Sequence, residues 1–320
     1  MKLLRSTCVA LAWFGVLAPG LFSGAAKADT LAEVCQPFAA TLDGGLGLGN
    51  DDTHHFNDTV DPNFAFDVHN KADYRIFFGD AAARYKFCNT DLNAQIDASY
   101  VGNKFQYGFE DTWHAGGILF LRDQSIGLLG IDGSYIARDQ HYDFVSPDTR
   151  SKWLRFGVRG EWFAGENVTL GARVGHIDGD TSGFNLNGFD ESVWARIYAT
   201  SNLALTAKLD AGQFDYTGDK ISDWAISADA EYLIPDQQVS LFGGARYAMK
   251  HSTFLGNANI PNTLDDQYAS AFVGLKIYLG TAARGNTLVS QQRNNTLDNT
   301  SMLFERLPGS DGFMSIPNNP

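Results

Sequence analysis

The sequence predicts an all-β protein, an antiparallel up-and-down transmembrane β-barrel of about 12 strands. Three observations support this fold class. Segments of roughly ten residues alternate apolar and polar positions, tight turns alternate with longer polar connections, and no run of about 18 apolar residues occurs beyond residue 28. A chain without a hydrophobic helix crosses a bilayer only as a closed barrel, because only closure pairs every backbone group in the sheet.

The first 28 residues have the pattern of a cleavable secretory signal. Lys2 and Arg5 precede an apolar run, which ends in the small-residue sequence Ala26-Lys27-Ala28. The run is short for a membrane span of about 20 residues. We therefore predict that residues 1–28 are removed on export and that residues 29–38 form a periplasmic N-terminal segment.

Charge and cysteine content fit an exported protein. The 320 residues carry a formal net charge of −13, and removal of the signal takes away three basic residues, so the remainder is more acidic. An acidic chain repels nucleic acid, which excludes it as a partner. Only Cys35 and Cys88 remain after cleavage, and an even count in an exported chain favours one disulfide between them. Two unpaired thiols are the alternative.

The first five strands follow from alternation and turn residues. The third is the clearest, because apolar residues at 92, 94, 96, 98 and 100 alternate with Asn93, Gln95, Asp97 and Ser99. Between the first two strands, we expect residues 50–73, with His54, His55 and His69, to form a long polar loop. The five predicted strands occupy residues 39–49, 79–88, 92–100, 111–121 and 126–137.

The remaining strands alternate in the same way. They are predicted near residues 154–162, 168–174, 192–200 and 203–214, in two strands that meet at 235–237, and in residues 268–279. Every connection after an even-numbered strand is tight, and every connection after an odd-numbered strand is longer and rich in Asp, Asn, Gly and Thr. This asymmetry is typical of barrels whose termini are periplasmic.

Aromatic residues at the strand ends support a membrane barrel. Outward-facing Tyr135 and Trp224 fall at one set of ends and Trp162 and Tyr232 at the other, as two interfacial girdles require. A soluble β-sandwich is the alternative, but its aromatic residues would gather in mid-strand core positions.

The last strand carries a resemblance to a known class. Residues 271–279 read Ala-Phe-Val-Gly-Leu-Lys-Ile-Tyr-Leu, which is similar to the terminal assembly signal of bacterial outer-membrane β-barrels and porin-like proteins. The class-level resemblance covers residues 39–280. It implies a place in the cell outer membrane, contact with outer-membrane lipid, and periplasmic termini. Many members end at this strand, whereas residues 281–320 follow here.

Residues 281–320 are predicted to form a largely disordered periplasmic tail. They are rich in Asn, Gln, Ser, Thr and Pro and show no sustained periodicity. Their only apolar cluster lies in residues 297–307. A docking motif for a periplasmic partner, a plug for the lower mouth and a solvated extension all remain open.

Strand parity places ten charged residues on the lumen side. Opposite charges across a narrow pore create a transverse field that orients dipolar and anionic solutes. The alternative is an ion-paired network that packs the lumen. The predicted pore-lining residues are a basic arc of Arg155, Arg159, Arg173, Arg196 and Lys208 and an acidic set of Asp97, Asp132, Asp210, Asp229 and Glu231.

Together these features predict a porin-like channel for passive diffusion of small hydrophilic solutes, anionic ones among them. The alternative is a closed barrel that presents extracellular loops, notably residues 50–73, to a partner. A lipid hydrolase is a lesser alternative, because His114 and His176 lack a nucleophile in register. We therefore expect no enzyme. The five histidines expected in loops lack metal-ligand spacing, and no phosphate-binding glycine loop precedes a helix, so no metal or cofactor is expected.

Overall fold

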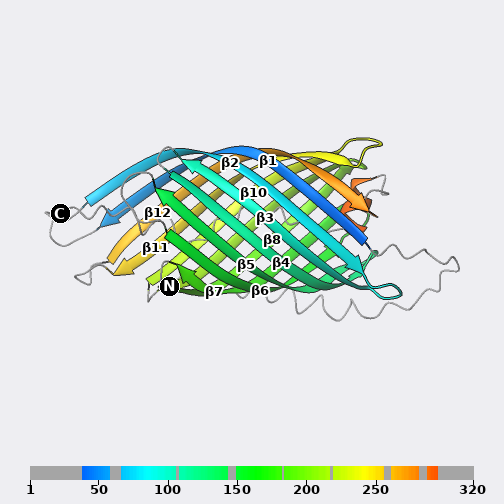
Figure 1. Cartoon of the computed structure of the whole chain (residues 1–320), viewed down its shortest axis with the longest axis horizontal. Helices are drawn as coiled ribbons and strands as arrows, with labels where there is room; N and C mark the ends of the chain where they lie inside the picture. Colours follow the sequence, from blue (N-terminus) through cyan, green and yellow to red (C-terminus); the bar gives the residue numbers. More distant parts are fainter. Residues whose placement is uncertain are drawn as a thin grey trace. The chain divides into compact units, whose positions relative to one another are not determined.

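The computed structural model describes residues 38–57, 66–105, 108–142, 149–181, 184–216, 219–255, 261–280 and 287–294. The described strands form a closed antiparallel barrel in which each strand pairs with its sequence neighbours and β1 pairs with β12 (Figure 1). The predicted fold class is confirmed. The strands are β1 (Phe38–Asn57), β2 (Phe66–Lys86), β3 (Leu92–Phe105), β4 (Gly108–Asp123), β5 (Gly127–Tyr142), β6 (Thr149–Phe163), β7 (Val168–Thr181), β8 (Phe184–Thr200), β9 (Leu203–Tyr216), β10 (Asp219–Leu233), β11 (Val239–Leu255) and β12 (Pro261–Gly280).

Strand alternation separates an apolar outer face from a polar inner face. On β3, Ile96 is 69% exposed, whereas its neighbours Gln95 and Asp97 are buried. The same contrast holds at Ile131, Leu154 and many other strand positions. A continuous apolar exterior of this extent is unfavourable in water and typical of a barrel that faces lipid.

At one end of the barrel, here called the turn side, short connections join consecutive strands. They occupy residues 87–91, 124–126, 164–167, 201–202 and 234–238. Asn89, Gly165 and Asp236 have φ angles of 64°, 72° and 60°, the left-handed region that tight turns use. In one turn the Ser125 hydroxyl and amide donate to Asp123 at 2.6 and 2.7 Å, and these bonds lower the pKa of Asp123.

The opposite end, the loop side, differs from the prediction. β1 and β2 stay paired from Asn50↔Asp73 to Asn57↔Phe66, so most of the predicted loop 50–73 is a strand extension. The connections after β3, β7 and β9 are confined to residues 106–107, 182–183 and 217–218, so the expected difference in connection length does not hold there. Beyond a bilayer both faces of a strand meet water, so pairing continues without the hydrophobic alternation that predicts strands.

Because the strands are longer than predicted, the histidines that were expected in loops lie in strands. His54, His55, His69, His141 and His251 all lie within strands, on β1, β2, β5 and β11. That expectation was wrong for the same reason, since these loop-side stretches are polar on both faces.

A short helix, α2 (Leu288–Asn294), follows β12 in the segment expected to be largely disordered. Leu288 is fully buried against Ala39, Tyr198 and Tyr278, so contacts with the barrel stabilise a helix too short to form alone. No helix in the described ranges is long and apolar enough to cross a membrane. Residues 1–37 and 295–320 lie outside the described residues. The predicted signal, Cys35 and the apolar cluster 297–307 therefore stay predictions, as does the disulfide to Cys88 in the 87–91 turn.

Candidate functional site

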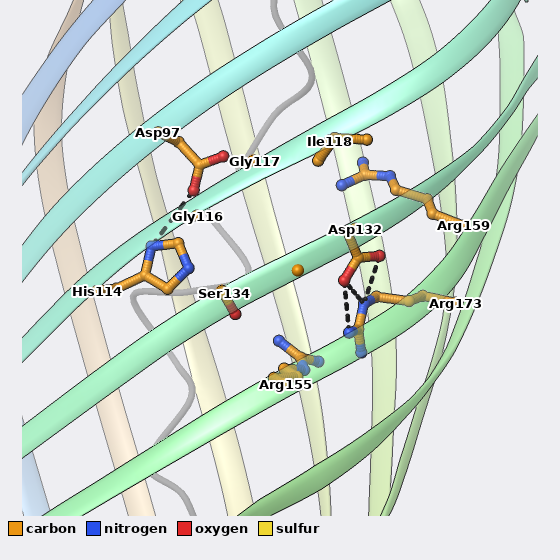
Figure 2. A pocket seen from close by; sticks show the side chains of 11 residues that line it. Asp97, His114, Gly116, Gly117, Ile118, Asp132, Ser134, Arg155, Arg159 and Arg173 are labelled. Atoms are coloured by element: carbon orange, nitrogen blue, oxygen red, sulfur yellow. Dashed lines mark hydrogen bonds and ion pairs between the residues drawn. The ribbon is translucent and has the colours of Figure 1, made fainter.

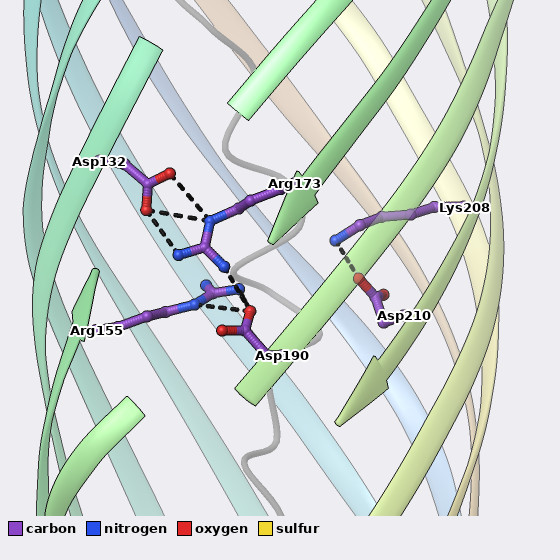
Figure 3. A network of polar contacts seen from close by, with 6 residues as sticks. All are labelled: Asp132, Arg155, Arg173, Asp190, Lys208 and Asp210. Atoms are coloured by element: carbon purple, nitrogen blue, oxygen red, sulfur yellow. Dashed lines mark hydrogen bonds and ion pairs between the residues drawn. The ribbon is translucent and has the colours of Figure 1, made fainter. Parts of the chain in front are cut away.

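The inner face of β5–β8 carries an ion-paired network, here called the charged wall: Asp132, Arg155, Arg173 and Asp190 (Figure 3). Arg173 lies between two carboxylates. Its Nη2 is 2.7 Å from Asp132 Oδ1 and its Nη1 is 2.5 Å from Asp190 Oδ2. Arg155 also donates to Asp190, from Nε at 3.0 Å and from Nη2. Two guanidinium groups therefore share the Asp190 carboxylate.

Two glycines make room for the Arg173 guanidinium. The cross-strand Cα partners run Asp132↔Gly157, Gly157↔Gly175 and Gly175↔Asp190, so the carboxylates and glycines form one row. A Cβ at Gly157 would lie 2.5 Å from Arg173 Nη2, and one at Gly175 would lie 2.6 Å from Arg173 Nη1. Any side chain at either position would push the guanidinium away from its carboxylates.

The other predicted basic residues also have inward partners. Arg159 donates to Glu161 at 2.8 Å and lies over the Trp194 ring, with 4.8 Å to its centroid. Lys208 pairs with Asp210 at 2.6 Å. The expected basic arc is therefore divided among local ion pairs, because each of these cations has a carboxylate within reach along or across the strands.

The remaining predicted residues lie elsewhere on the inner face. Arg196 donates to Thr206 at 3.2 Å. Asp97 lies 3.3 Å from His114 Nδ1. Asp229 has Thr206 and Gly244 as its Cα partners. Glu231 lies near the turn side, where it accepts from Ser240 at 2.6 Å and faces Lys276 at 3.5 Å.

Two partners in these networks were missing from the predicted site. Asp190 lies upstream of residues 192–200, the extent predicted for that strand, although the same alternation continued by two residues includes it. Glu161 is two residues from Arg159 on β6 and so has the same parity. The alternation of inward and outward residues, followed along the whole strand, identifies both carboxylates as inward-facing.

A small cavity lies beside the charged wall. Figure 2 shows Asp97 and His114 on one side, Arg159, Arg173 and Asp132 on the other, and Ser134 between them. Both signs of charge border this cavity. Ile118 and three glycines also line the cavity, so it presents apolar as well as polar surface.

The side of the barrel opposite the charged wall carries aromatic side chains in place of ion pairs. We call it the aromatic wall: Phe78 on β2, Phe242 on β11 and Phe272 on β12. β1, at the middle of this wall, lies six strands from β7 in either direction around the ring. The Phe78 ring centroid is 5.9 Å from that of Phe242 and 6.2 Å from that of Phe272. The rings lie over glycines, since a Cβ at Gly45 would be 2.5 Å from the Phe78 ring.

α2 is attached to inward-facing groups at the turn side. Arg293 donates to the carbonyl oxygens of Gly165 at 2.9 Å and Val168 at 2.7 Å, and its guanidinium lies 4.7 Å from the Phe163 ring centroid. Gln292 donates to Glu231 at 2.8 Å. These contacts hold the helix on the inner side of the wall, at the turn-side mouth. The composition of the segment carries no periodic signal of this helix, and only its docking surface accounts for it.

Known proteins add the following. No protein-family model matches the chain, and no curated protein matches it. Similar solved structures include the translocator domain of autotransporter NalP from Neisseria meningitidis (11% identity, covering 85% of this chain and 97% of that chain, TM-score 0.43), the β-domain of a Bordetella autotransporter (12%, 74% and 99%, 0.44) and an outer-membrane channel from Pseudomonas putida F1 (12%, 78% and 100%, 0.43). They are bacterial outer-membrane β-barrels, the class that the sequence resembles. Identities and TM-scores at this level carry no information about function.

Proposed function

We propose that this protein is an outer-membrane channel for passive diffusion of small hydrophilic solutes, anionic ones among them, and that the charged wall sets its selectivity. The main support is the position of Arg155 and Arg173 with their carboxylates inside a barrel whose exterior is apolar. On the lipid face a cation near the bilayer midplane costs about 2 to 4 kcal/mol. Charged side chains that line a passage discriminate solutes by charge.

Because the charged wall and the aromatic wall face each other, the proposed passage would orient a solute across the lumen. A solute carboxylate or hydroxyl would turn toward the guanidinium groups of Arg159 and Arg173, which border the cavity. Its less polar flank would face Phe78 and Phe272 across the lumen. Guanidinium groups donate several hydrogen bonds in fixed directions, which suits carboxylates and phosphates.

Planar-bilayer recording of the purified full chain tests this function. We expect discrete openings, and we expect the double substitution Arg159→Glu with Arg173→Glu to shift the reversal potential toward cation selectivity. Lys152→Glu is the matched control, because Lys152 is exposed and has the parity of outward-facing Leu154. An unchanged reversal potential in the double variant would remove these arginines from the proposed passage.

A closed barrel that presents its loop side to a partner is the second candidate. It is favoured by α2 at the turn-side mouth and by the burial of Arg155, Arg159 and Arg173, each at most 8% exposed. Truncation after Gly280 removes α2 and separates the candidates. Openings that appear only after truncation mean that α2 closes a channel, whereas silence before and after truncation supports the closed barrel. Heat-modifiable migration on gels checks that each variant is folded.

A catalytic role finds no support in the positions of the two candidate histidines. His114 is buried on the inner face beside Asp97, away from lipid. The His176 ring packs on Phe189, with 5.0 Å between ring centroids. We therefore retain a channel without catalytic residues as the proposal.

A further inference from the structure

Four aromatic residues on the outer face of β2–β4, toward the loop side, form a group here called the outer aromatic cluster: Phe77, Tyr100, Phe109 and Trp113. The Phe77 ring stacks on the Phe109 ring, with 5.6 Å between centroids. The Tyr100 ring centroid lies 5.7 Å from that of Phe77 and 4.5 Å from that of Trp113, which is 56% exposed. Aromatic rings on a lipid-facing surface gather at the membrane–water interface, so this cluster marks the depth at which lipid headgroups begin.

Two basic side chains lie beyond the cluster on the same face, Arg75 on β2 and Lys104 on β3. The two residues are Cα partners across the strands, and both are exposed. Neither side chain has a hydrogen bond or an ion pair with another described residue. Directly opposed residues of an antiparallel pair have Cβ atoms about 4.5–5.5 Å apart, and like charges at such positions destabilise the sheet. An anion bound between them would remove this repulsion.

The row that contains the two cations continues with apolar residues on both sides. Leu48 of β1 is the partner of Arg75, and Phe109 of β4 is the partner of Lys104. Leu48 is 67% exposed and belongs to the apolar exterior. The two cations therefore lie at the edge of the lipid-facing surface, where an anionic headgroup is within reach.

The nearest outward carboxylates by strand position already have partners. Asp73, two residues before Arg75, accepts a hydrogen bond from Asn50 Nδ2 at 3.0 Å. Asp111 accepts one from the Tyr100 hydroxyl. Within the described ranges the protein thus leaves both cations available to an external anion.

We infer that Arg75 and Lys104 bind the phosphate of a membrane-lipid headgroup, and that the lipid's acyl chains lie along the outer aromatic cluster and the apolar surface next to it. A guanidinium donates paired hydrogen bonds that match phosphate oxygens, and a lysine ammonium adds a second positive charge. Soluble phosphate would meet the same two cations but would gain nothing from the aromatic rings. This inference goes beyond the proposed function and holds whether or not the barrel conducts.

Native mass spectrometry of the detergent-purified full chain, titrated with dioleoylphosphatidic acid, tests the site. We expect one lipid to be retained per chain at a concentration at which dioleoylphosphatidylcholine, with its neutral headgroup, is not retained. The double variant Arg75→Gln with Lys104→Gln should weaken binding of phosphatidic acid about 25-fold, because each cation near an anionic lipid contributes about fivefold.

The matched control is Lys71→Gln with Arg150→Gln, which also removes two outward cations near the loop side. Lys71 Nζ is already 2.8 Å from Asp52 Oδ2, and Arg150 Nε is 3.2 Å from Asp139 Oδ1. Because both charges have carboxylate partners, the control should bind phosphatidic acid as the wild type does. Heat-modifiable migration on gels checks that every variant is folded.

Equal weakening in the test and control variants would overturn the inference, because binding would then follow net charge alone. Equal retention of the two lipids by the wild type would overturn it as well. Trp113→Ala separates a lipid site from a site for soluble anions: it should weaken retention of phosphatidic acid. Inorganic phosphate that binds the wild type as tightly as phosphatidic acid, measured by isothermal titration, would assign the two cations to free phosphate and contradict a lipid site.

Discussion

The charged wall and the aromatic wall both depend on glycine, but they use it differently. Gly175 makes room for the flexible end of Arg173, whose Nη1 would lie 2.6 Å from an added Cβ. Gly45 faces backbone, because an added Cβ would lie 2.2 Å from the Val273 carbonyl oxygen. A crowded side-chain end can move, whereas a paired backbone cannot. Substitutions should therefore change selectivity at the charged wall and assembly at the aromatic wall.

The largest effect is expected from loss of the shared carboxylate in the charged wall. Asp190→Asn removes the carboxylate that Arg155 and Arg173 share and leaves Arg173 with Asp132, and breaking a buried ion pair costs about 3 to 5 kcal/mol. Urea unfolding in detergent micelles, followed by tryptophan fluorescence, measures the change in unfolding free energy. The double variant Asp190→Asn with Arg155→Gln should recover part of the loss. A loss below about 1 kcal/mol would mean that lumen water screens the network as it does surface pairs.

A direct comparison of glycine substitutions should give the next largest effect. Gly45→Ala forces a Cβ against the backbone of β12 and should destabilise the barrel by about 1 to 3 kcal/mol, with slower appearance of the heat-modifiable form. Gly175→Ala should retain the folding yield and shift the reversal potential, because it displaces Arg173. If the two variants behave alike in both measurements, the distinction between the walls is wrong.

The smallest effect is expected within the aromatic wall. Phe242→Leu keeps an apolar side chain but loses the ring contact with Phe78, which is worth about 1 kcal/mol. Unfolding free energy should fall by that amount while the reversal potential stays at the wild-type value. A change in ion selectivity would show that the aromatic wall takes part in discrimination.

Sequence reasoning predicts the membrane-facing part of the barrel well and the water-facing parts poorly. The strand predicted at residues 92–100 lies within β3, and Arg159 and Arg173 lie inward as parity predicts. The extension of β1 and β2 was predicted as a loop, since alternation ends where both faces are wetted. α2 was missed because its stability comes from Leu288 and Arg293 docking on distant strands.

The sequence by itself determined which face of the sheet each residue occupies, because side-chain direction repeats every two residues and is a local property of a strand. Only the tertiary structure decided which of these residues are neighbours. Arg173 meets Asp132 from 41 residues away, and Arg155 meets Asp190 from 35 residues away. Register between strands is set by pairing and closure of the whole barrel, so the ion pairs cannot be read from local spacing.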